Sequence, residues 1–226
     1  MKLILRDRNQ GMVDAWKVQF RGVPDVEIGR GDIFDSPADA IVSPANSGGW
    51  MNGGIDLAYS QKFGWQLQER LQKYLVRFLD GELPVGNALV MTVDEAGTDE
   101  FGYRFMISAP TMRVPTDING TVNAYLAMRA ILREVRKHNH RAAESGDLPP
   151  MNSVLCPGLG TAIGRMPYDI AAFQMREAYR VVTENQPLDF HDIAGLYCHH
   201  DAMRRGLPYR EPESVFGVKD KAGSSS

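Results

Sequence analysis

The spacing of hydrophobic residues changes repeatedly along this chain between the periods of strands and of helices. Short apolar or alternating runs predict strands over residues 2–6, 16–20, 26–29, 39–43, 88–93, 104–109 and 153–156. Apolar positions at helical spacing predict helices over residues 55–63, 66–79 and 168–182, and a long helix that begins after Asn119 or Thr121. Strands and helices alternate from about residue 26 to 185, which favours an α/β fold with helices on both faces of a sheet.

The two ends of the chain give weaker patterns. In residues 16–20 the apolar side chains of Trp16, Val18 and Phe20 alternate with polar ones, which is the spacing of a half-buried strand. Residues 138–150 are charged and end in two prolines, so we expect a surface connection there. We predict a single domain over residues 1–226, with a core of about residues 26–185. It would carry extra N-terminal strands in residues 1–25, a C-terminal extension over 186–226 and a disordered tail over 222–226.

Composition narrows the class of protein. The chain has 226 residues, a net charge of −3 and a pI near 6.0, which argues against broad binding of duplex nucleic acid. Its two cysteines make no disulfide framework, and no apolar run is long enough to span a membrane, so we expect a cytoplasmic protein without membrane association. The adjacent His199 and His200 point in different directions on any regular element, so we predict neither a metal site nor a cofactor.

Two glycine-rich segments follow predicted strands directly. The first has four glycines within residues 48–54, and the second has three within residues 158–164. Glycines at a strand-to-helix junction let backbone N–H groups approach a ligand closely, and the helix N-terminus adds partial positive charge. Because ligands bind beyond the carboxyl ends of strands in such sheets, we expect both loops to lie on one edge and to hold an anion such as phosphate.

Four side chains near these loops carry candidate chemistry. Asp32 follows the strand at 26–29 and can accept a hydrogen bond from an exocyclic amine such as that of adenine, or it can cap a turn. Asn46 suits a vicinal diol, or it bonds its own loop. Asp56, inside the start of a helix, is either a general base or a helix cap. Trp50 either stacks on a ligand or covers the core.

In their order along the chain these motifs resemble the macrodomain family, which binds ADP-ribose. The matching segments are Gly31-Asp32-Ile33, residues 40–46, residues 52–56, residues 83–88, residues 106–110 and the second loop over residues 157–167. The resemblance covers roughly residues 26–185 and keeps the ten-residue step from Asn46 to Asp56. The sequences of these motifs are similar to those of a bacterial or phage-associated subgroup of the family. The resemblance implies a three-layer α/β/α fold built on a mixed sheet.

The resemblance also implies the role of each site residue. Asp32 and Ile33 would bind adenine, and Asn46 would contact the distal ribose. The remaining ligand-binding residues would be Asn52, Gly53, Gly54 and Ile55 in the first loop and Gly158, Gly160, Thr161, Ala162, Ile163 and Gly164 in the second.

Two functions follow from the resemblance. One is hydrolysis of an ADP-ribosyl linkage, in which Asn46 and Asp56 would orient and activate water at the distal ribose. The alternative is a module that binds ADP-ribose or an ADP-ribosylated partner without turnover. Three residues depart from the family's pattern. Ser43 replaces the first asparagine, Ser60 replaces a histidine of some hydrolases, and Gly164 lies at or beside the position of an aromatic residue. The last two departures favour the binding module.

Overall fold

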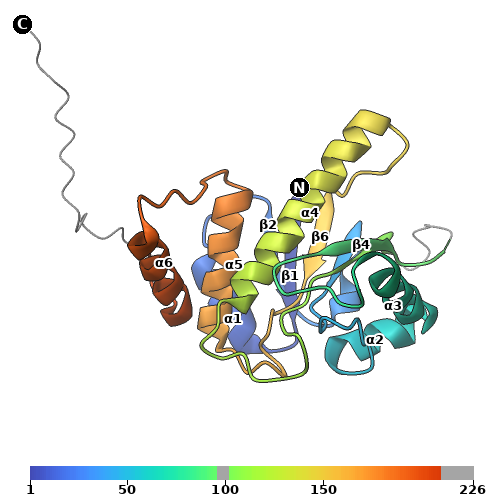
Figure 1. The fold of residues 1–226 in the computed structure, drawn as a ribbon, viewed down its shortest axis with the longest axis horizontal. Helices are drawn as coiled ribbons and strands as arrows, with labels where there is room; N and C mark the ends of the chain where they lie inside the picture. The colour runs from blue at the N-terminus through green and yellow to red at the C-terminus, as the bar shows by residue number, and fades with distance from the viewer. Residues whose placement is uncertain (96–101, 210–226) are drawn as a thin grey trace, which may run out of the picture.

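The computed structural model describes residues 1–95 and 102–209, and its strands form one mixed sheet (Figure 1). The strands are β1 (Lys2–Asp7), β2 (Val26–Arg30), β3 (Ala40–Ser43), β4 (Leu89–Thr92), β5 (Phe105–Ser108) and β6 (Ser153–Cys156). Their order in the sheet is β2-β1-β6-β3-β5-β4. Neighbouring strands run parallel, except that β4 is antiparallel to β5 at the edge.

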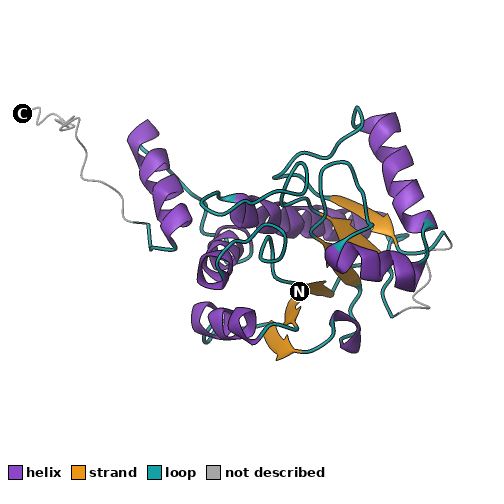
Figure 2. Ribbon diagram, turned by 90° about the horizontal axis from the view of Figure 1, so that it is seen from below, coloured by secondary structure: helices purple, strands orange, loops and turns teal. Residues whose placement is uncertain are grey.

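Helices cover both faces of this sheet. They are α1 (Gln10–Gln19), α2 (Gly54–Phe63), α3 (Gln66–Phe78), α4 (Asn123–Ser145), α5 (Tyr168–Val182) and α6 (Ile193–Arg205), with a short 3-10 helix, η1 (Ile33–Asp35). Successive strand residues point to opposite faces. Leu3 and Leu5 therefore pack with α1, α4 and α5, whereas Ile4 packs with α2 and α3. Figure 2 shows helices on either side of the strands, and the predicted three-layer α/β/α class is confirmed.

The predicted strand over residues 16–20 is wrong, because these residues lie in or directly after α1. Asn9 caps this helix, and its side chain accepts a hydrogen bond from the Gly11 N–H. Trp16 is fully buried, while Val18 is 62% exposed, which is a helical and not a strand-like distribution. The other N-terminal strand, β1, lies between β2 and β6 in the interior of the sheet.

The surface connection predicted over residues 138–150 is wrong in its first half. Helix α4 continues to Ser145, because His138 and Ala142 extend its buried face, and Gly146 ends it in a left-handed conformation with φ 69°. Beyond α5 the chain forms α6, and the tail predicted to be disordered lies outside the described residues. Among the helices that the structure describes, none is both long and apolar enough for a membrane span.

Candidate functional site

A cavity of about 450 Å³ lies beyond the carboxyl ends of the parallel strands. The residues predicted for the site all line it: Asp32, Ile33, Asn46, Asn52, Gly53, Gly54, Ile55, Asp56, Gly158, Gly160, Thr161, Ala162, Ile163 and Gly164. They come from the chain after β2, after β3 and after β6. The prediction that both glycine-rich loops lie on one edge of the sheet is therefore confirmed. The volume lies within the range of small-molecule sites.

Both loops present backbone N–H groups that the fold does not use. Helix α2 begins at Gly54, and the first N–H groups of a helix have no partner within it. In the part of the chain that the structure describes, the N–H groups of residues 53–55 and 161–164 donate to no protein acceptor. These two sets of donors line the same cavity, so the site is suited to an anion without a lysine.

Close packing explains the glycines of the second loop. Gly160 has φ 72°, a conformation that favours glycine, and a Cβ there would lie 2.6 Å from the Ile118 side chain. A Cβ on Gly164 would lie 2.5 Å from the carbonyl oxygen of Gly160. The loop therefore has no room for a side chain at residue 164, at or beside which the resemblance implies an aromatic residue. The nearby aromatic side chain that lines the cavity is Tyr168, at the start of α5.

Asp56 is a buried carboxyl group held at the end of β3. It lies in the first turn of α2, it is 7% exposed, and its Oδ1 accepts a 2.5 Å hydrogen bond from the Ser43 hydroxyl. Burial raises the pKa of Asp56 to about 7, and the Ser43 hydrogen bond lowers it in part. The group can therefore change protonation state near neutral pH. Its contact with Ser43 holds the carboxyl group at the end of the strand, where it lines the cavity.

The raised pKa of Asp56 predicts a pH-dependent free energy of unfolding. Between about pH 4 and pH 7 the folded protein keeps a proton that the unfolded chain has released, so stability falls as pH rises. The slope from this group is at most about 1.4 kcal/mol per pH unit. Urea unfolding of the wild type and of Asp56→Asn at pH 5 and pH 7 should show this fall in the wild type alone. The same pH dependence in both proteins would contradict the shift.

Asn46 holds the first loop in place. Its amide Nδ2 donates to the Trp50 carbonyl at 2.8 Å, and its Oδ1 accepts from the Trp50 N–H at 3.2 Å. This is the loop-bonding alternative weighed for Asn46, although an amide retains a second N–H and a second lone pair for a ligand. The same two hydrogen bonds fix the backbone of Trp50, a residue that is 56% exposed and lines the cavity.

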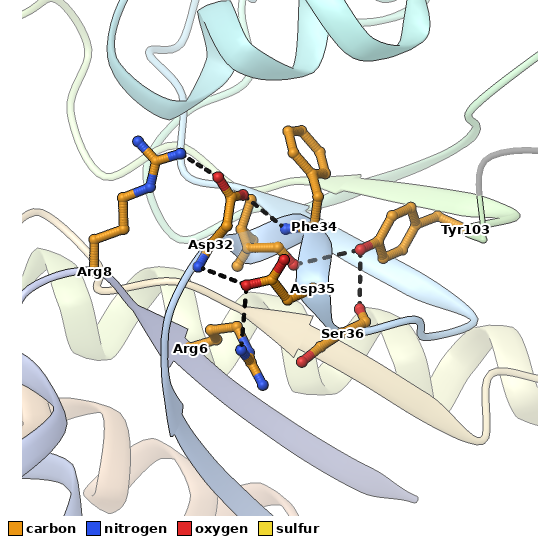
Figure 3. Close-up of polar contacts among 8 residues, drawn as sticks. Arg6, Arg8, Asp32, Phe34, Asp35, Ser36 and Tyr103 are labelled. Atoms are coloured by element: carbon orange, nitrogen blue, oxygen red, sulfur yellow. Dashed lines mark hydrogen bonds and ion pairs between the residues drawn. The ribbon is translucent and has the colours of Figure 1, made fainter.

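Asp32 lines the cavity after β2, three strands away from β3 in the sheet, and belongs to a compact polar cluster (Figure 3). It caps η1 by accepting from the Phe34 N–H at 3.0 Å, and its other oxygen pairs with Arg8. The Phe34 hydrogen bond and the Arg8 guanidinium lower the pKa of Asp32, so the group is a carboxylate at neutral pH. Asp35 completes the capping box by accepting from the Asp32 N–H at 3.1 Å.

The sequence-based prediction missed one wall of the cavity, at the end of β1. Arg6, Asp7, Arg8 and Asn9 line it, and Asp7 accepts a 3.3 Å hydrogen bond from the Gly158 N–H of the second loop. The available signal was the apolar run of residues 3–5 followed at once by charged residues, which is how an interior parallel strand ends at a site.

The amino-acid sequence is similar to a known family and to proteins of other organisms. The family model described as Macro domain matches residues 42–175. An uncharacterized protein of Aquifex aeolicus is 33% identical over 157 residues, which cover 69% of this chain and 81% of that protein. An uncharacterized protein of Sulfolobus acidocaldarius is 31% identical over 176 residues, which cover 78% and 83%.

Solved structures share the fold at lower sequence identity. The macrodomain of Mycobacterium tuberculosis DarG is 21% identical with a TM-score of 0.52, over 68% of this chain and 88% of that one. A mutant Oceanobacillus iheyensis macrodomain with ADPR is 22% identical with a TM-score of 0.53, over 70% and 77%.

Proposed function

Since this chain belongs to the macro domain family, we propose that its cavity binds ADP-ribose or an ADP-ribosyl group and that the protein hydrolyses the ADP-ribosyl linkage. One observation carries the binding proposal: two sets of unused backbone N–H groups, from loops about a hundred residues apart, line one cavity. A mutant of the Oceanobacillus iheyensis macrodomain, which has this fold, has a solved structure with ADPR.

The chemistry of the cavity suits the parts of ADP-ribose in order. The Asp32 carboxylate would accept from the adenine amine beside the Ile33 backbone, and the two loops would hold the diphosphate. Asn46 and Asp56 follow β3, which lies three strands away from β2 in the sheet, and the distal ribose would lie near them. This assignment rests on the residue types, on the order of the strands and on the resemblance to the family.

Asp56 is the candidate general base for hydrolysis. As a carboxylate it would take a proton from a water molecule whose oxygen forms a bond to the anomeric carbon of the distal ribose. The bond from that carbon to the acceptor breaks, and the acceptor leaves with the electron pair and gains a proton equivalent to the one that Asp56 took, which returns Asp56 to the carboxylate. A base with a pKa of about 7 is partly deprotonated at neutral pH and still accepts protons well.

A binding module without turnover is the second candidate. The observation that favours it is Ser60, which stands where some hydrolases of the family have histidine. Ser60 is buried, and its hydroxyl donates to the Met51 carbonyl at 2.8 Å, so it serves the fold of the first loop. Both candidates require ADP-ribose binding, and calorimetry that detects no binding by the wild type would exclude both.

Asp32→Ala is expected to weaken ADP-ribose binding by about 10- to 100-fold, because a hydrogen bond to a charged group is lost. Ribose 5-phosphate, which lacks the base, should bind with nearly unchanged affinity. The matched control is Asp35→Ala, which removes the same charge from the same capping box but whose side chain does not line the cavity. Calorimetry with both ligands tests this, and equal losses for the two variants would contradict the assignment of Asp32.

A further inference from the structure

The C-terminal helix α6 lies outside the matched family region but contacts the start of α5. At its end, Gly206 packs so closely that a Cβ there would lie 2.7 Å from the Ile170 side chain. Helix α5 begins at Tyr168, directly after the second glycine-rich loop. The end of α6 is therefore close in the fold to one wall of the cavity, although α6 contributes no residue to the cavity lining.

Two side chains tie α6 to the connection before α4. Arg204 of α6 donates from Nε to the Gly120 carbonyl at 2.6 Å. Gln174 of α5 is fully buried, and its Nε2 donates to the carbonyls of Thr121 at 2.8 Å and Met203 at 3.1 Å. Its Oε1 accepts from the Tyr125 N–H at 3.1 Å, so both polar atoms of this buried amide are used. Such a fully bonded buried amide fixes the elements that it joins.

The same connection supports the second loop. The Ile118 N–H donates to the Gly164 carbonyl at 2.9 Å, and the Ile118 side chain fills the space beside Gly160 and Gly164. Within the connection, the Thr121 hydroxyl donates to the Ile118 carbonyl at 2.7 Å. A continuous set of hydrogen bonds and packing contacts therefore runs from Arg204 to the backbone of the loop.

We infer that α6 positions the second glycine-rich loop for its ligand through residues 118–121, with Arg204 as the positioning residue. This inference rests on the proposed binding of ADP-ribose by that loop. Arg204 is exposed and its guanidinium binds a backbone carbonyl, so its loss frees the Gly120 turn without opening the core. The turn then constrains Ile118 less, and Ile118 constrains the loop less. The loop conformation that binds the ligand becomes less populated, and the affinity for ADP-ribose falls by the same factor.

Arg204→Ala tests this positioning role in the full chain, with Arg205→Ala as the matched control. Arg205 is the next residue of the same helix, and it pairs at 3.0 Å with Asp201 of α6 itself. Hydrogen exchange without ligand is expected to accelerate at the N–H groups of Ile118 and Met166, which bond to Gly164 and Gly160, in Arg204→Ala alone. Calorimetry is expected to show about threefold to tenfold weaker ADP-ribose binding in the same variant alone.

Each other outcome overturns the inference. Unchanged exchange in Arg204→Ala would show that α6 does not constrain the loop. Equal acceleration in both variants would assign the effect to general loosening of α6. Faster exchange with unchanged affinity would show that the constraint does not serve the ligand. Failure of the wild type to bind ADP-ribose would refute the proposed function and, with it, the role of α6 in ligand binding, whereas the exchange comparison would still show whether α6 constrains the loop.

Discussion

Asp56→Asn is expected to lower the rate of ADP-ribosyl hydrolysis by about 10²- to 10⁴-fold and to change ADP-ribose affinity by less than about threefold. The substitution keeps the size of the side chain and an oxygen that accepts from the Ser43 hydroxyl, so the contact at the end of β3 is retained. It removes the group that takes the proton from water. The loss should therefore fall on turnover and leave binding nearly intact.

The measurement is release of ADP-ribose from a mono-ADP-ribosylated protein under single-turnover conditions, with calorimetry of both proteins as the reference for binding. Asn52→Ala is a useful comparison, because Asn52 lines the same cavity but is exposed and carries no proton-accepting group in the proposed reaction. If Asp56→Asn hydrolyses the substrate as fast as the wild type, Asp56 is not the base. If the wild type releases no ADP-ribose from any linkage tested, the binding module is the better description.

The raised pKa of Asp56 bears on this choice between enzyme and binding module. A carboxyl group that only capped a helix would bond backbone N–H groups, and such bonds lower its pKa. Asp56 instead bonds the Ser43 hydroxyl, and burial raises its pKa to about 7. Perturbed carboxyl groups that line a cavity are typical of functional sites. This environment favours the enzyme, whereas Ser60 favours the module.

Most of the fold was predictable because its strands are short and the central strands β3 and β5 are buried on both faces. Residues such as Ile41 and Val42 in β3 belong to the two opposite cores, so the strand is a continuous apolar run in the sequence. The order of glycine-rich loops and strands also placed both loops on one edge. The strands and the loops that follow them can be recognised from local sequence. Because the carboxyl ends of parallel strands meet at one edge of the sheet, the loops must lie together at that edge.

The rest depended on contacts between distant segments. The place of β1 between β2 and β6 brings Asp7 to the Gly158 N–H, and no local pattern in the sequence shows this pairing. The hydrogen bond between Ser43 and Asp56 depends on how α2 packs against the end of β3, which the local sequence does not show. The extension of α4 depends on burial of His138, whose charged neighbours in the sequence favoured a surface segment.

Trp16→Ala is expected to lower the free energy of unfolding by about 3–5 kcal/mol, because it removes a large side chain that is fully buried. Trp16 joins α1 to α5, and its Nε1 donates to the Met175 sulfur at 3.4 Å. Val18→Ala, two residues along, should change stability by no more than about 0.5 kcal/mol, because Val18 is 62% exposed. Urea unfolding of the three proteins at one pH measures both differences.

The pair also separates the two interpretations of this segment. In a strand, residues 16 and 18 point to the same face, so a half-buried strand would give substantial losses for both variants. In α1 they lie about 200° apart around the helix axis, and one is buried while the other faces solvent. Similar losses would therefore contradict the helix. Because α1 begins directly after Asn9, which lines the cavity, they would also contradict the position of this wall of the site.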